Sequence, residues 1–123
     1  MDECFTPAQR IRRRSDYQKA YREGAKVNGR FMTLFLLPNG LDIGRLGVAA
    51  TRRFGGAVAR NRAKRRIREL FRRTRANTVG FDVVVIPRRP LLDATATELE
   101  ADYLKSVDRR TSHDRSHSRR PPR

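Results

Sequence analysis

The most distinctive chemistry in the chain lies in a run of side chains suited to binding anions, from Arg60 to Arg73. Residues 52–75 contain eleven Arg or Lys and a single acid, Glu69, so this segment carries +10 of the formal net charge of +16. An ordinary solvated helix face mixes signs, because opposite charges four residues apart contribute about 0.2–0.5 kcal/mol per pair. A face of one sign repels itself, and therefore favours a polyanionic partner such as nucleic acid.

Residue types that could catalyse a reaction are sparse. Both histidines, His113 and His117, fall in a polar C-terminal stretch, and Cys4 is the single cysteine. The acids before this stretch form no close pair outside the last expected helix, so the pattern indicates neither a general acid–base dyad nor a two-metal site. Gly55 and Gly56 are not followed by the Lys and Ser or Thr of a phosphate-binding P-loop. We therefore expect no catalytic residue, and no cofactor or metal held by the protein alone.

Composition narrows the class of protein further. A chain of 123 residues, 37% of them hydrophobic, is long enough for one domain with a modest core. No apolar run approaches the roughly 18 residues of a membrane span, and the acidic N-terminus does not resemble a signal peptide. A lone cysteine cannot form an internal disulfide, which favours a reducing compartment. We expect a cytoplasmic protein that has no membrane partner.

The cationic run is expected to lie on a helix over about 57–75, whose apolar residues share one face. At 100° per residue that face, which would pack on a sheet, holds Ala63, Ile67, Leu70, Phe71 and Thr74. The opposite ridge holds Asn61, Arg65, Arg68 and Arg72, with Arg62 beside it and Lys64 and Arg66 on the flanks. Arg60 falls in the apolar sector, but in the first turn, where its side chain can pass the edge of the sheet.

The rest of the chain predicts a small α/β sandwich with a mixed sheet, followed by a basic tail. The expected elements are a helix over 16–23 closed by Gly24, strands over 31–37, 46–51 and 81–87, and a helix over 95–107. The connection 38–45 has hairpin length, so the first two strands are expected to be antiparallel neighbours. Residues 1–108 are expected to form one domain, and 109–123, which lack residues that could pack, a disordered tail.

At this point several segments resemble one known family. The run Gly56-Ala-Val-Ala-Arg-Asn-Arg-Ala-Lys-Arg-Arg-Ile-Arg-Glu-Leu-Phe71 is similar to the signature of the protein subunit of bacterial ribonuclease P. Three further segments, 10–24, 45–55 and 80–89, resemble that family in the same order. The resemblance spans roughly residues 9–107.

The resemblance implies a fold and an activity. The family has an α+β sandwich with a roughly four-stranded mixed sheet and a left-handed β-α-β crossover around the basic helix, whereas the general rule for such crossovers predicts a right-handed one. Its catalyst is an RNA subunit that uses Mg²⁺ to remove the 5′ leader of precursor tRNA. The protein binds this catalytic RNA and the leader, and no obligate protein partner is implied.

The resemblance also implies which residues bind RNA. The positions matching the basic helix are Arg60, Asn61, Arg62, Lys64, Arg65, Arg66 and Arg68, and Arg52 and Arg53 are expected to contact phosphates. The positions matching the leader cleft are Tyr17, Tyr21 and Phe35, with cations including Arg13 nearby. Spacing alone favours both tyrosines as core residues, and Phe31, on the same strand face as Phe35, could take its role.

Two other functions stay open at this stage. A plain RNA-binding or ribosome-associated basic protein would explain the charge and the helix, but not the four matching segments. A nuclease acting without RNA would need carboxylates or a histidine that the folded part does not supply.

Overall fold

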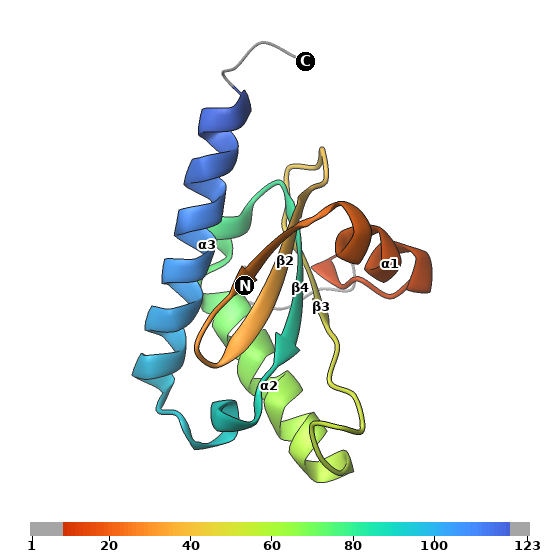
Figure 1. The fold of residues 1–123 in the computed structure, drawn as a ribbon, viewed down its shortest axis with the longest axis vertical. Coiled ribbons are helices and arrows are strands. Elements are labelled where there is room, and N and C mark those ends of the chain that lie inside the picture. Colours follow the sequence, from red (N-terminus) through yellow and green to blue (C-terminus); the bar gives the residue numbers. More distant parts are fainter. Residues whose placement is uncertain (1–8, 119–123) are drawn as a thin grey trace.

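The computed structural model describes residues 9–118, with side chains for 9–108, as three helices and a four-stranded sheet (Figure 1). In chain order the main elements are α1 (Arg14–Glu23), β1 (Ala25–Asn28), β2 (Met32–Pro38), β3 (Arg45–Val48), α2 (Ala57–Arg73), β4 (Phe81–Pro87) and α3 (Ala96–Ser118). Two short 3-10 helices, η2 (Arg75–Thr78) and η3 (Arg89–Asp93), flank β4. The predicted α+β fold with a mixed sheet is confirmed.

The strand order β1-β2-β4-β3 places the most apolar strand, β4, inside the sheet. β4 pairs antiparallel with β2 and parallel with β3, and α2 lies on the crossover from β3 to β4. The prediction that the strands now seen as β2 and β3 are neighbours was wrong, because β4, with three consecutive fully buried valines, takes the position between them. That the β3-α2-β4 crossover is left-handed stays a prediction from the resemblance.

The short strand β1 was not predicted, although the turn signal Asn28-Gly29 marks the hairpin that joins it to β2. The hairpin is held to α3 by Asp102, whose carboxylate accepts hydrogen bonds from the backbone N–H groups of Arg30 and Phe31, both at 3.0 Å. A Cβ at Gly29 would lie 2.8 Å from that carboxylate, so the tight approach requires glycine.

The sheet separates two apolar clusters of unequal size. The larger one, between the sheet and helices α2 and α3, contains the α2 residues predicted to face inward: Ala63, Ile67, Leu70 and Phe71. The smaller one lies under α1 on the other face and consists of Ile11, Ala20 and Val84, with Tyr17 and Phe35 packed against it. In Figure 1, α1 stands apart from α2 and α3 accordingly.

Helix α3 is longer than the sequence predicts. It begins as expected at a capping box, in which Thr95 and Glu98 each donate a backbone N–H to the other's side chain. It then continues to Ser118. That residues 109–123 form a disordered tail stays a prediction. The remaining tail residues, 119–123, lie outside the described residues.

Gly24 ends α1 as predicted, but for a reason other than left-handed backbone. Its φ is −75°, and its N–H donates to the Ala20 carbonyl at 2.8 Å. A Cβ there would lie 2.5 Å from that carbonyl oxygen and 3.3 Å from that of Leu36. Glycine is therefore needed chiefly because a side chain would clash with the last turn of α1 itself, and the Leu36 carbonyl of β2 adds a second tight contact.

We predict that Tyr103 stabilises the fold by its ring and not by its hydroxyl. The side chain is fully buried in the larger cluster, and its hydroxyl, near the side chains of Thr74 and Thr78, makes no hydrogen bond of good geometry within the described residues. Tyr103→Phe should change the free energy of unfolding by less than about 1 kcal/mol, whereas Tyr103→Ala should cost about 3–5 kcal/mol. Urea denaturation measures both. A large loss for Tyr103→Phe would contradict the prediction.

Candidate nucleic-acid interface

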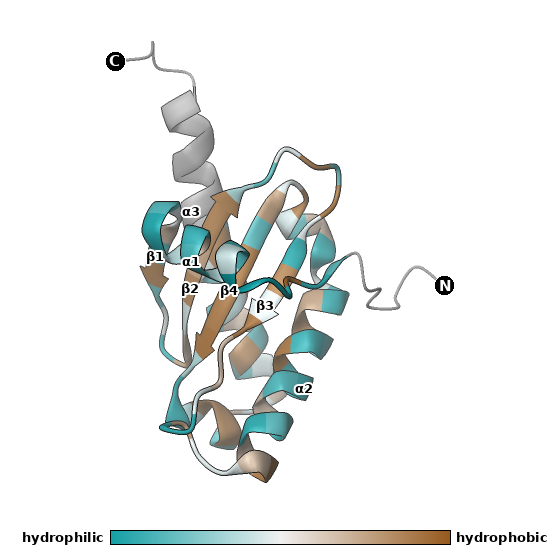
Figure 2. Cartoon of the chain, turned by 90° about the vertical axis from the view of Figure 1, so that its right-hand side faces the viewer, coloured by the Kyte–Doolittle hydropathy of each residue, from teal (hydrophilic) through white to brown (hydrophobic). Residues whose placement is uncertain are grey.

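The outer face of α2 presents a cluster of cations to solvent. Asn61, Arg62 and Arg65 are exposed and Lys64 is half-buried, and none of the four forms a hydrogen bond or ion pair within residues 9–108. A hollow on this face is lined by one amide, four cations and one acid: Asn61, Lys64, Arg65, Arg68, Arg72 and Glu69. Figure 2 shows the hydrophilic side of α2 turned outward. This hollow can receive a phosphate group without displacing an existing partner.

Towards its C-terminal end the same helix is partly neutralised. Arg72 pairs with Glu69 at 2.5 Å, and Arg73 pairs with Glu100 of α3 at 2.6 Å. The Arg72 hydrogen bond is the main cause of the lowered pKa of the Glu69 carboxyl. The cationic field is therefore concentrated on the N-terminal two-thirds of α2.

Two predicted RNA contacts on α2 have acceptors within the protein. Arg66 donates to the Leu91 carbonyl of η3 at 2.8 Å, and Arg60 donates to the Gly55 carbonyl at 3.1 Å. These bonds satisfy carbonyls of η3 and of the loop that enters α2. The role of Arg60 and Arg66 in RNA binding stays a prediction, and both side chains also have a place in the fold.

The loop before α2 extends the cationic surface. Arg52 and Arg53 are exposed, while the next residue, Phe54, is buried in the larger cluster. The Phe54 N–H donates to the Thr51 carbonyl at 3.0 Å and closes the turn. The buried ring therefore anchors the loop, and both arginines face solvent.

The three aromatic residues predicted for a cleft do come together, between α1 and the sheet. The rings of Tyr21 and Phe35 meet edge to face with centroids 5.1 Å apart, and those of Tyr17 and Tyr21 are 6.5 Å apart. Phe35 lies opposite Lys26 on β1 and Val84 on β4. Tyr21 is 40% exposed, so this group offers ring surface on which a base can stack.

The choice between Phe31 and Phe35 is decided by their positions. Phe31 is 5% exposed and belongs to the larger cluster on the far face, where Arg30 lies over its ring at 4.9 Å. Phe35 lies on the α1 face beside Tyr21. Arg13 is exposed at the start of α1, where its carbonyl accepts the first hydrogen bonds of the helix.

Tyr17 is seated more deeply than Tyr21. Burial raises the pKa of its hydroxyl, while a hydrogen bond with the Val48 backbone and the charge of Arg68 lower it. A Cβ placed on Gly47 of β3 would lie 2.8–2.9 Å from two ring carbons and the hydroxyl oxygen of Tyr17. Tyr17 therefore lies directly on the strand, and Tyr21 is the more accessible of the two tyrosines.

The cationic surface and the aromatic group meet at Arg68. Burial lowers the pKa of the Arg68 guanidinium, and the charge of Arg10 lowers it further, whereas Tyr17 raises it. Arg68 thus lies on the cationic face of α2 and near Tyr17 at once.

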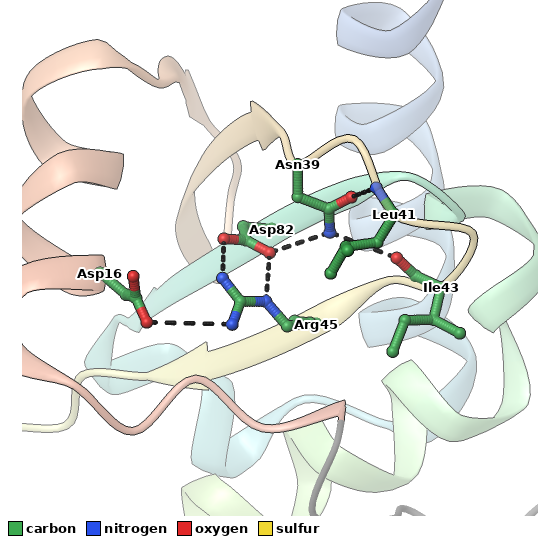
Figure 3. A network of polar contacts seen from close by, with 6 residues as sticks. All are labelled: Asp16, Asn39, Leu41, Ile43, Arg45 and Asp82. Carbon is green, nitrogen blue, oxygen red and sulfur yellow. Dashed lines mark hydrogen bonds and ion pairs between the residues drawn. The ribbon is translucent and has the colours of Figure 1, made fainter.

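Sequence reasoning did not identify the residues that hold α1 in place. Arg45 donates to both oxygens of the Asp82 carboxylate, and its guanidinium also lies 3.8 Å from Asp16 of α1 (Figure 3). Arg45 and Gly47 are two apart on β3, so both point towards α1. The sequence feature that could have identified them is the short run Arg45-Leu-Gly47. It indicates a role in holding α1 only once α1 is known to lie across β3.

Two classes of site are not found in the described part of the chain. No group of three or more His, Cys, Asp or Glu residues among the described side chains, 9–108, lies so that it could hold a metal ion. Of the helices described, none is both long enough and apolar enough to cross a membrane.

A family model described as Ribonuclease P matches residues 5–111. The chain belongs to the ribonuclease P protein family. The ribonuclease P protein component of Thermotoga sp. (strain RQ2) is 42% identical over 92 residues, which are 74% of this chain and 79% of that relative. Among solved structures, the ribonuclease P protein of Thermotoga maritima is 33% identical with a TM-score of 0.74, over 81% of this chain and 96% of that one. A Staphylococcus aureus ribonuclease P protein mutant with defective mRNA degradation activity is 30% identical with a TM-score of 0.76, over 85% and 89%.

We predict that Arg65 and Arg66, although adjacent, respond differently to replacement by alanine. Arg65 has no partner among the described residues, so Arg65→Ala should reduce the salt slope of binding to a structured RNA by about 0.7–0.9, the value for one neutralised phosphate. Arg66→Ala instead removes the hydrogen bond to the Leu91 carbonyl and should lower the free energy of unfolding by about 1 kcal/mol. RNA titrations between low and moderate salt and urea denaturation separate the two effects. An unchanged slope for Arg65→Ala would make this side chain merely solvated.

Proposed function

We propose that this protein is the protein subunit of a ribonuclease P ribonucleoprotein, which removes the 5′ leader of precursor tRNA to make the mature 5′ end. Its RNA subunit would be the catalyst and would use Mg²⁺. The protein would bind that RNA through the cationic face of α2 and the loop before it, and the leader through the aromatic group between α1 and the sheet. It would act in the cytoplasm.

The observation that carries this proposal is the presence of an exposed cationic face on α2 together with a partly exposed aromatic group between α1 and the sheet. A structured RNA, with its high density of phosphates, suits the unpaired cations on α2. A leader differs from one precursor to the next, and stacking on Tyr21 and Phe35 accepts any base at about 1–3 kcal/mol each. A protein with these two surfaces can hold a catalytic RNA and its substrate together.

Family membership and the order of the segments favour this proposal over a plain RNA-binding or ribosome-associated protein. A general RNA binder needs the cationic face but not an aromatic group beside it. The names of the relatives support the subunit function, since they are ribonuclease P protein components. The plain binder therefore stays as the alternative that the following assay distinguishes.

We predict that the protein stimulates cleavage of precursor tRNA only when a bacterial ribonuclease P RNA is present. The assay compares cleavage at low Mg²⁺ by that RNA alone, by the protein alone and by both together. Stimulation in the combined reaction alone supports the subunit function, and tight RNA binding without stimulation would favour the plain binder. Because one S. aureus relative is a mutant with defective mRNA degradation activity, the protein-alone arm also includes a messenger RNA. Cleavage there would contradict the expected absence of catalytic residues.

We predict that Tyr21 contributes to binding of the precursor but not of mature tRNA. In the complex with ribonuclease P RNA, Tyr21→Ala should weaken precursor tRNA by about 1–3 kcal/mol, the value of one stacked base, and leave mature tRNA unchanged. The matched control is Leu41→Ala, which removes a comparably exposed apolar side chain (47% against 40%) from a loop that is far along the chain from α1. Equal weakening of both tRNAs would return Tyr21 to a purely structural role.

A further inference from the structure

Helix α1 contacts the sheet at three positions within about one turn, each through a different kind of contact. Asp16 lies 3.8 Å from the guanidinium of Arg45, Tyr17 lies on the Cα of Gly47, and Ala20 is fully buried against Val84 in the smaller cluster. Because a helix is rigid over one turn, fixing positions 16, 17 and 20 also fixes position 21. The place of Tyr21 beside Phe35 is therefore set by contacts one turn away from it.

Two of these contacts come from the same side of β3. The guanidinium of Arg45 is fixed by Asp82 of the neighbouring strand β4: Nε and Nη2 donate to the two Asp82 oxygens at 2.8 and 2.6 Å. Asn39 donates to the same carboxylate at 3.0 Å (Figure 3). Asp82 itself is 5% exposed. The guanidinium that meets Asp16 is thus pre-positioned by a buried, bidentate partner.

Gly47 determines how closely α1 can approach. The missing side chain leaves room for the Tyr17 ring directly on the strand, and any Cβ would come within 2.9 Å of ring atoms. A larger residue at position 47 would force the outer end of the Tyr17 side chain to move off the strand.

We propose that Arg45 and Gly47 are positioning residues, which set the depth and rotation of α1 and so hold Tyr21 against Phe35 for the 5′ leader. This inference rests on the proposed function and assigns to β3 a role in substrate binding that its residues perform without touching the substrate. It also gives the two tyrosines different roles: Tyr17 packs on β3 and fixes the position of α1, and Tyr21 contacts the leader.

The seat of α1 can be perturbed without unfolding the protein. It belongs to the smaller cluster, which is separated from the larger one by the sheet. Asp16→Asn is isosteric at a half-buried position and removes the α1 side of the ion pair, while the Arg45–Asp82 pair stays intact. Gly47→Ala is the stronger perturbation, because it acts on the Tyr17 ring directly.

The experiment measures how strongly the complex with ribonuclease P RNA prefers precursor over mature tRNA. Gly47→Ala should reduce this preference at least about fivefold, the lower limit for losing one stacked base, with unchanged affinity for the RNA subunit. Asp16→Asn should reduce it on the order of twofold, as expected for a half-exposed ion pair. Asp42→Asn is the charge-matched control from an exposed loop and should leave the preference unchanged.

The direction of the Asp16→Asn effect is itself informative. Removing an acid makes the protein more cationic, and this alone would strengthen the binding of any RNA. The control Asp42→Asn measures the size of that charge effect. A loss confined to the precursor therefore cannot come from charge. An unchanged preference in folded Asp16→Asn and Gly47→Ala proteins would overturn the inference.

A double-mutant cycle tests whether Gly47 acts through Tyr17. In a Tyr17→Ala background there is no ring to displace, so Gly47→Ala should have little further effect on the preference. Full additivity would overturn the positioning role and leave a general loss of stability, which thermal unfolding reports separately. If the wild-type complex shows no preference for the precursor at all, the proposed function fails together with the inference, whereas an effect missing only in the variants rejects the inference alone.

Discussion

The burial of one stripe of α2 is the constraint on which the rest of the molecule depends. A helix with so many cations and a single acid repels itself and would not be stable in isolation. Ile67, Leu70 and Phe71 are each at most 4% exposed, and burying a side chain of this size contributes about 1.5–3 kcal/mol. This packing offsets the repulsion, and it also fixes the rotation of the helix. The cations point outward together because the apolar stripe can be buried only against the sheet.

The sheet extends this logic to its other face. Successive valines of β4 point to opposite sides, so Val83 and Val85 enter the larger cluster and Val84 the smaller one. The larger cluster supports the cationic face of α2, and the smaller one supports α1 and its aromatic group. Each surface therefore has its own apolar support, while the rigid sheet between them fixes their separation. A change to the seat of α1 need not disturb α2.

The sequence predicted the features that depend on local periodicity, and it failed where distant segments decide. The inward face of α2 followed from the spacing of its apolar residues, and it is confirmed. The pairing of β2 with β3 was predicted from a short connection, but the greater apolarity of β4 prevailed. Alternation along a strand put Phe31 and Phe35 on one face, yet Phe31 precedes β2 and turns into the other cluster. The backbone acceptors of Arg60 and Arg66 lie in segments whose position no pattern in α2 could reveal.

Neither the cationic face of α2 nor the aromatic group distinguishes one RNA sequence from another, so selectivity can come only from their arrangement. Phosphate contacts on α2 depend on charge, and stacking on Tyr21 and Phe35 depends on ring area, so neither reads a particular base. What distinguishes one RNA from another is whether it presents a dense phosphate surface and an adjacent unpaired strand at the spacing that the sheet imposes. Arg68, between the cationic face and Tyr17, lies where these two demands meet. Under the proposed function the catalytic RNA would meet the first demand and the leader the second, so the arrangement of the two surfaces, and not a base sequence, would select the substrate.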